Sequence, residues 1–218
     1  MQGAWWAFGI TIASLAALAY YAFVILPARI HRWRCEGLRA FARLIELRTQ
    51  GRYGKAEPMA ELASAVAQRL GIPLHERRRM ELAVYLRDIG MVAIPYPVLN
   101  KRTPLTPAER ELIGRHAEIS ASITEQIPGL WHVAPIVRLH HVVYSEQPDA
   151  PLTAHILSAL DDWLRIAECA DADTASSVLK QGAGARYHPL ATQAILSEVH
   201  QRALNSVQTL TRSAALWL

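Results

Sequence analysis

The sequence predicts an all-α protein in which a single transmembrane helix precedes a helical bundle. Three observations support this prediction. A long uncharged apolar segment lies near the amino terminus, apolar residues further along recur at helical spacing, and no segment alternates apolar and polar residues as a strand would. We therefore divide the chain into a transmembrane anchor over residues 1–27, a juxtamembrane amphipathic helix or linker over 28–52, and a helical domain over 53–218.

The anchor is predicted from residues 4–26, which contain no charged side chain. About 20 apolar residues are enough for a helix to cross the hydrocarbon core of a membrane. A cleaved signal peptide is the alternative, but its apolar region is shorter and follows a basic segment, whereas no Lys or Arg precedes this one. Arg29, Arg32 and Arg34 follow the segment, so the positive-inside rule places the amino terminus outside and the domain in the cytoplasm.

The anchor and the helix after it also offer a route to a homodimer. Gly9, Ala13 and Ala17 recur at intervals of four residues, and such a stripe lets a second helix approach closely. Ala and Gly are common in membrane helices in any case, so the stripe leaves pairing open. In the amphipathic helix that follows, arginines are interleaved with an apolar face formed by Leu38, Phe41, Ala42 and Ile45.

Helices are predicted through the rest of the chain. The strongest start signal is at Thr106, which offers an N-cap before Pro107 at the first helical position. Residues 93–107 contain several prolines and are expected to form a loop. By apolar spacing, the predicted helices cover residues 57–70, 75–89, 106–127, 133–144, 152–168, 174–182 and 189–210.

The charge distribution argues against a nucleic-acid-binding protein, and the cysteine spacing argues against a disulfide-stabilised one. The formal net charge is +4, but the excess is concentrated in residues 29–34 and 77–79, and no aromatic residues interleave with an extended basic stripe. We therefore expect no nucleic acid partner. The two cysteines, Cys35 and Cys169, have neither metal-site nor disulfide spacing, which fits a reducing compartment.

Several polar residues of the metal-ligand type lie inside apolar helical segments. Any one of them could be a hydrogen-bonded core histidine or a capping aspartate. Together they indicate one shared site, because burying so many polar groups without a common partner is costly. Histidines and carboxylates that converge on one cavity are what metal-assisted phosphate ester hydrolysis requires. The candidate metal ligands are Asp88, His116, His140, His141 and Asp161.

The order of these motifs resembles the HD-GYP family, from about residue 53 to residue 199. The matching segments are "YLRDIGMVAIPYPVL", "LNKRTPLTPAERELIGRHAEIS", "IVRLHHVVY", "PLTAHILSALD" and "GAGARYHPLATQAIL". The resemblance implies an all-helical cytoplasmic domain of a bacterium, related to phosphodiesterases that open cyclic di-GMP at a cluster of two or three metal ions. With the anchor, it implies a single-pass protein of the bacterial inner membrane.

The sequence departs from the family at several functional positions. Arg87 replaces the histidine of the His-Asp pair, and Met91 replaces a lysine that attends the substrate phosphate. Lys55 stands where the family offers an early histidine, and Leu164 stands where a second aspartate is common. The segment "SEQPDAP", after the paired histidines, is too short to hold the Gly-Tyr-Pro motif. The five candidate metal ligands survive.

We infer that side-chain cations replace one metal ion. Arg87, with Lys55 as a second candidate, can neutralise Asp88 and the distal aspartate, because a guanidinium stays protonated and binds carboxylates with two hydrogen bonds. The second metal position keeps enough ligands for a single divalent ion of Fe, Mn or Zn, or holds none. The alternative is that Arg87 points into solvent and the histidines hydrogen-bond one another.

These departures favour a catalytically inactive signalling or protein-interaction module, whose partner is a membrane protein or a signalling protein. One alternative is a single-metal phosphohydrolase that acts on a nucleotide. Another is a nucleotide-binding sensor in which Arg87 and the basic pair Lys101 and Arg102 contact phosphates without cutting them. The residues alone do not identify the partner.

Overall fold

The computed structural model describes residues 3–49 and 55–215, and it confirms the predicted all-α fold. Every regular element in these ranges is a helix, and the isolated bridge between Ala183 and Tyr187 is the β pairing found in them. The outer limits of the predicted anchor and domain, at residues 1 and 218, and the boundary at 52 and 53 lie outside the described residues.

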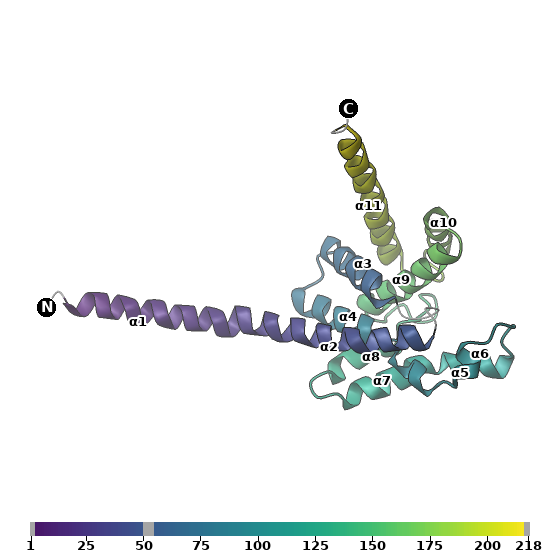
Figure 1. Ribbon diagram of the computed structural model, residues 1–218, viewed down its shortest axis with the longest axis horizontal. Helices are drawn as coiled ribbons and strands as arrows, with labels where there is room; N and C mark the ends of the chain where they lie inside the picture. The colour runs from purple at the N-terminus through teal and green to yellow at the C-terminus, as the bar shows by residue number, and fades with distance from the viewer. Residues whose placement is uncertain (1–2, 50–54, 216–218) are drawn as a thin grey trace.

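One long helix runs from the amino terminus into the domain (Figure 1). It consists of α1 (Gly3–Tyr20), a five-residue π-helical turn η1 (Tyr21–Ile25) and α2 (Leu26–Arg48). Figure 1 shows its amino-terminal half projecting alone from the domain. This half is apolar and is not buried against the rest of the chain, so by length and composition the helix could span a membrane.

The second half of this long helix packs on the domain. Cys35, Leu38, Ala42 and Ile45 form its buried face, with spacings of three and four residues. The prediction that Phe41 belongs to this face was wrong, because its side chain is 53% exposed. Phe41 lies about 100° around the helix from Ala42, and the face is completed by Cys35 instead.

The core of the domain forms around α4 (Leu74–Leu86), which packs against α2, α3 (Ala56–Arg69) and α9 (Leu152–Cys169). These helices bring long apolar side chains together, and Met59, Met80, Leu86, Ile156 and Leu160 are nearly or fully buried. The chain then closes with α10 (Ala172–Gly182) and α11 (Pro189–Ala215). Burial of these apolar faces is the main source of stability.

Two predicted helices are broken, and in both cases a histidine ring contacts a backbone carbonyl beside the break. The segment predicted as one helix over 106–127 is α6 (Pro107–Gly114) followed by α7 (His116–Gln126). The segment predicted over 133–144 is η3 (Trp131–Val133) and the short α8 (Ala134–Arg138), followed by a turn. His116 Nδ1 lies 2.7 Å from Ile113 O, and His140 Nδ1 lies 2.6 Å from Val137 O. Each side chain takes a carbonyl that a continuing helix would use.

Short helices also occur where the sequence predicted other structure. The helix predicted over 75–89 ends at Leu86, and a 3-10 turn η2 (Ile89–Ala93) follows it. The predicted proline loop contains one helical turn, α5 (Tyr96–Leu99), with Pro97 near its start. Proline is tolerated in the first turn of a helix because its missing N–H has no partner there in any case.

Gly90 lets η2 lie directly against α7. A Cβ atom at this position would lie 2.3 Å from His116 O and 2.8 Å from the backbone nitrogen of Ser120. The Gly90 N–H also donates a hydrogen bond to Ser120 Oγ at 2.8 Å. This contact fixes the segment containing Asp88 beside the first turn of α7, which carries His116.

A buried carboxylate ties α9 to the turn before α11. Asp162 accepts hydrogen bonds from Tyr187 Oη at 2.9 Å, Arg186 Nη2 at 3.1 Å and Arg165 Nη2 at 2.6 Å. Burial raises the pKa of Asp162, but the Arg165 hydrogen bond, the Arg186 charge and the Tyr187 hydroxyl outweigh burial, so that its pKa is below the ordinary value. The turn formed by "GAGARYHP" is thereby held against the helix that carries Asp161.

Gly90→Ala should destabilise the domain, because its methyl group would have to displace backbone atoms of α7. We expect a loss of roughly 1–3 kcal/mol, which lowers the melting temperature by about 2–10 °C. Gly114→Ala is the matched control, since a Cβ there meets no atom within 4 Å. Circular dichroism melts of the full chain in detergent test this, and equal melting temperatures for the two variants would contradict the close approach.

Asp162→Asn should destabilise the domain at neutral pH by roughly 1.5–3 kcal/mol, the usual contribution of hydrogen bonds to a charged group. A carboxyl whose folded pKa is depressed stabilises the protein above its unfolded pKa of about 3.9, and this contribution is lost as pH falls through the lower folded value. The difference between wild type and Asp162→Asn should therefore shrink below about pH 4. Urea unfolding across pH measures it, with the exposed Asp149→Asn as control; a difference independent of pH would refute the assignment.

Candidate metal centre

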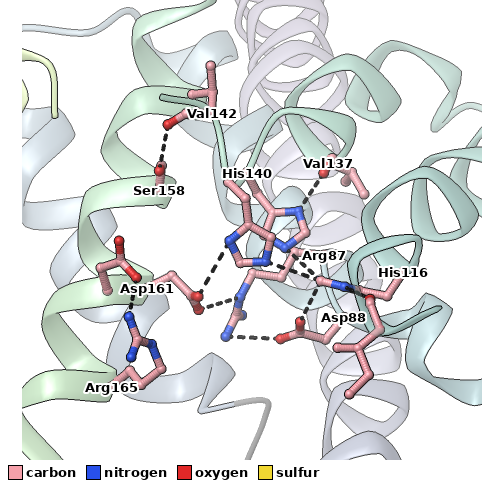
Figure 2. Close-up of polar contacts among 12 residues, drawn as sticks. Arg87, Asp88, His116, Val137, His140, Val142, Ser158, Asp161 and Arg165 are labelled. Atoms are coloured by element: carbon pink, nitrogen blue, oxygen red, sulfur yellow. Dashed lines mark hydrogen bonds and ion pairs between the residues drawn. The ribbon is translucent and has the colours of Figure 1, made fainter. Parts of the chain in front are cut away.

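The five candidate ligands meet in one place, from four separate parts of the chain. Figure 2 shows Asp88, His116, His140 and Asp161 there. Asp88 follows α4, His116 begins α7, His140 and His141 lie in the turn after α8, and Asp161 projects from α9. His140 is fully buried, whereas His141 is exposed at the rim. The fold thus brings together side chains separated by up to 73 positions in the sequence.

The three histidines point their Nε2 atoms at one another. His116 Nε2 lies 3.2 Å from both His140 Nε2 and His141 Nε2. The Nδ1 atoms of His116 and His140 face carbonyl oxygens, which can only accept, so these nitrogens carry the protons. In the neutral rings both Nε2 atoms are then bare acceptors, and two bare acceptors this close repel unless a cation or an added proton lies between them.

Burial also favours the neutral form of the His140 and His141 rings. Desolvation, together with the neighbouring rings of His141 and His116, lowers the pKa of His140 well below its ordinary value. Desolvation likewise lowers the pKa of His141, although Asp161 opposes the effect. An added proton on His140 or His141 is therefore disfavoured at neutral pH. Uncharged imidazole is the form of histidine that binds metals.

A single divalent cation fits this arrangement. His116, His140 and His141 each offer a ring nitrogen, and these three atoms all lie within 4.8 Å of one another. Backbone carbonyls hold the other ring nitrogen of His116 and His140, as is usual for metal-binding histidines. Asp88 Oδ1 is 3.7 Å from His116 Nε2, and Asp161 Oδ2 is 3.8 Å from His141 Nδ1, so both carboxylates adjoin the cluster. Three histidine nitrogens with an open position suit zinc or another divalent transition metal.

Arg87 lies between the two aspartates and does not point into solvent. Its side chain is only 2% exposed. Nη2 is 3.2 Å from Asp88 Oδ2, Nε is 3.4 Å from Asp161 Oδ1, and Nη1 donates to Val84 O at 2.7 Å. Figure 2 shows the guanidinium between the two carboxylates and below the histidine rings. A buried positive charge thus connects two carboxylates that would otherwise face each other across the site.

Three of the other predicted positions lie apart from the centre. Lys55, just before α3, forms its ion pair with Glu168, two helical turns beyond Asp161 on α9. Lys101 pairs with Glu109 at 2.7 Å, beside the capping box of α6. Arg102 is exposed in the turn that precedes that helix. The ion pairs of Lys55 and Lys101 are thus formed with glutamates and not with a carboxylate of the centre.

Met91 belongs to the core rather than to a substrate site. Its side chain is fully buried and packs in a small cluster with Ile45, Ile94 and Leu99. The cluster joins η2 and α5 to the end of α2. At this position the chain thus presents an apolar contact and no charge toward a phosphate.

Sequence reasoning missed a second polar cluster, where α2 meets α4. His31 Nε2 is 2.7 Å from Glu81 Oε2 and 3.6 Å from Cys35 Sγ. Burial and the nearby Glu81 carboxylate raise the pKa of Cys35 to about 12, so its thiol stays protonated at neutral pH. His31 and Cys35 are four residues apart on one helix, and this spacing was the available signal.

Comparison with known proteins identifies the family. The model of the HD domain matches residues 39–188, more than half of the chain. The cyclic di-GMP phosphodiesterase response regulator RpfG of Xanthomonas campestris is 35% identical over 136 residues, which cover 58% of this chain and 36% of the relative. A cyclic di-GMP phosphodiesterase of Pseudomonas aeruginosa is 34% identical over 104 residues, which cover 47% and 25%.

The chain thus spans well under half the length of either relative. The matched region nevertheless includes the end of α2 and every residue of the candidate centre. The match and the predicted motif order agree, and the motif residues meet at one site. This chain belongs to the HD domain family, with relatives among the cyclic di-GMP phosphodiesterases.

Proposed function

We propose that this protein is a membrane-anchored and catalytically inactive HD-GYP-like domain, which acts as a signalling or protein-interaction module in the bacterial cytoplasm. The observation that carries the proposal is the position of Arg87. Its guanidinium contacts both Asp88 and Asp161, where two carboxylates of a metal cluster would bind cations. A side chain that neutralises both aspartates leaves less need and less room for a metal ion between them.

Loss of a metal ion removes the chemistry that phosphodiester hydrolysis needs. A metal polarises the phosphate and lowers the pKa of the attacking water, contributions of several kcal/mol to the barrier. Arg87 can stabilise negative charge, but it cannot supply a hydroxide. Met91 adds no compensating charge, since it packs in the core.

A single-metal phosphohydrolase is the second candidate, and the three histidines favour it. Their converging Nε2 atoms offer a site for one ion without Arg87 having to move. If an ion binds there, His116, His140 and His141 would hold it and Asp88 would be the adjacent carboxylate. The same ion could instead stabilise an inactive domain, so metal content and turnover must be measured separately.

The proposed setting is the inner membrane, with the amino terminus outside and the domain in the cytoplasm. The apolar half of the long helix and the arginines that follow it support this orientation. A second copy could pair along Gly9, Ala13 and Ala17, since Gly9 has open space around its Cα. We further propose that the partner is a membrane protein or a signalling protein that recognises the domain.

The purified full chain should bind at most one divalent ion and should not hydrolyse cyclic di-GMP. His140→Ala should remove the ion, because it deletes one of three converging ligands. Elemental analysis for Fe, Mn and Zn measures the stoichiometry, and product analysis with cyclic di-GMP and a simple phosphodiester measures turnover. Two ions per chain, or turnover that His140→Ala abolishes, would overturn the proposal in favour of an enzyme.

Arg87→Ala should leave Asp88 and Asp161 without their buried counter-charge, at a cost of roughly 3–5 kcal/mol of stability. Arg87→His should bind an additional divalent ion, and metal should then restore stability to that variant more than to wild type. Melting temperatures with and without added Mn²⁺ measure both effects. If Arg87→Ala is as stable as wild type and Arg87→His gains no metal, the guanidinium does not replace an ion.

A further inference from the structure

α4 runs parallel to α2, and this places its first turn near the end of the apolar segment. Cys35 lies beside Glu81 and Arg39 Cζ is 6.0 Å from the ring of Tyr85, two pairs that are 46 positions apart. His31 Nε2 is 2.7 Å from Glu81 Oε2, a pair that is 50 positions apart. Continued backwards, these offsets set Leu74, the first residue of α4, level with residues 24–28.

Ala28 lies only two residues beyond Leu26, the last residue of the apolar segment. At 1.5 Å per residue, Leu74 is therefore at most about 3 Å past the edge of the hydrocarbon core in the proposed orientation. The headgroup layer extends about 5–7 Å beyond that edge. Figure 1 shows the turn between α3 and α4 on the side of the domain that faces α1.

The side chains at this end suit a lipid phosphate. Leu74 is 53% exposed, and Arg77 and Arg78 make no ion pair within the ranges that the structure describes. Arg77 Nε is buried without a hydrogen-bond partner. Nearby carboxylates are already paired, Glu76 with Arg79 at 2.8 Å and Glu81 with His31 at 2.7 Å.

A cavity of about 130 Å³ opens beside these arginines. It lies between α2, α3 and α4, and a phosphate group could enter it while the lipid chains remain in the bilayer. Its lining is His31, Ser64, Leu74, Arg77, Arg78, Met80 and Glu81.

We propose that the first turn of α4 binds an anionic phospholipid headgroup, with Arg77 and Arg78 on the phosphate and Leu74 at the hydrocarbon edge. This inference rests on the proposed membrane anchoring of α1. The domain then lies on the bilayer surface and is attached at two points, through the long helix and through the first turn of α4. Each basic side chain near an anionic membrane shifts the balance between docked and undocked domain by roughly five-fold.

A nitroxide label measures this contact in the full chain. The label is placed at Leu74→Cys in a Cys169→Ala background, which leaves only the buried Cys35. The protein is reconstituted in nanodiscs of phosphatidylcholine, with or without phosphatidylglycerol. Power-saturation spectroscopy then compares collisions of the label with oxygen, which enters the bilayer, and with a water-soluble nickel chelate.

In phosphatidylglycerol discs the Leu74 label should be several-fold less accessible to the chelate than a control label at exposed Ser177 on α10. Arg77→Gln with Arg78→Gln should weaken docking by about 25-fold and restore access. High salt should act in the same direction. Arg110→Gln on distant α6 is the matched control and should change nothing.

A third label at Leu15 in α1 separates this inference from the anchor itself. If Leu15 is shielded while Leu74 stays open to the chelate in both lipids, the headgroup contact is overturned and the anchor stands. If Leu74 is equally shielded in both lipids and insensitive to the arginine substitutions, the headgroup contact is also overturned. If Leu15 is open to the chelate, the anchor fails, and the headgroup contact fails with it.

Discussion

The bridge from Arg87 to Asp88 and Asp161 is the interaction on which the centre of this domain depends. It joins the end of α4 to α9, and through Val84 O it also satisfies a carbonyl of the helix that carries it. Isolated carboxylates are rarely buried, because the loss of hydration is too costly. In this chain the Arg87 guanidinium offsets that cost, because it pairs with both carboxylates. Their negative charge is therefore balanced within the chain.

Backbone carbonyls position two of the three histidines of the centre. His116 and His140 lie where the predicted helices break, and each ring contacts a carbonyl three residues earlier. This arrangement turns the bare Nε2 atoms toward one another and toward His141. One half of the site is therefore neutralised internally, while the other half still has the ligand geometry for one cation. The charge balance of the two aspartates is thus separate from the capacity of the three histidines to hold an ion.

The sequence was sufficient for the fold class and for the grouping of the candidate ligands. Polar residues buried inside apolar helical segments need polar partners, and this indicated that Asp88, His116 and Asp161 lie at one site. Local breaks could not be predicted, since a hydrogen bond from a histidine ring to a carbonyl leaves no periodic signal. The partner of Lys55 could not be predicted either, because Glu168 reaches it only through the packing of α3 against α9.

The π-helical turn at residues 21–25 changes how the two halves of the long helix are oriented about their common axis. A turn of this kind holds one residue more than an α-turn, so the angular phase shifts by about 100° where it occurs. A helical wheel drawn straight from Ala17 to Cys35 would therefore misjudge their relative azimuth by that amount. If two anchors associate along their small residues, the phase shift decides which sides of the two domains confront each other.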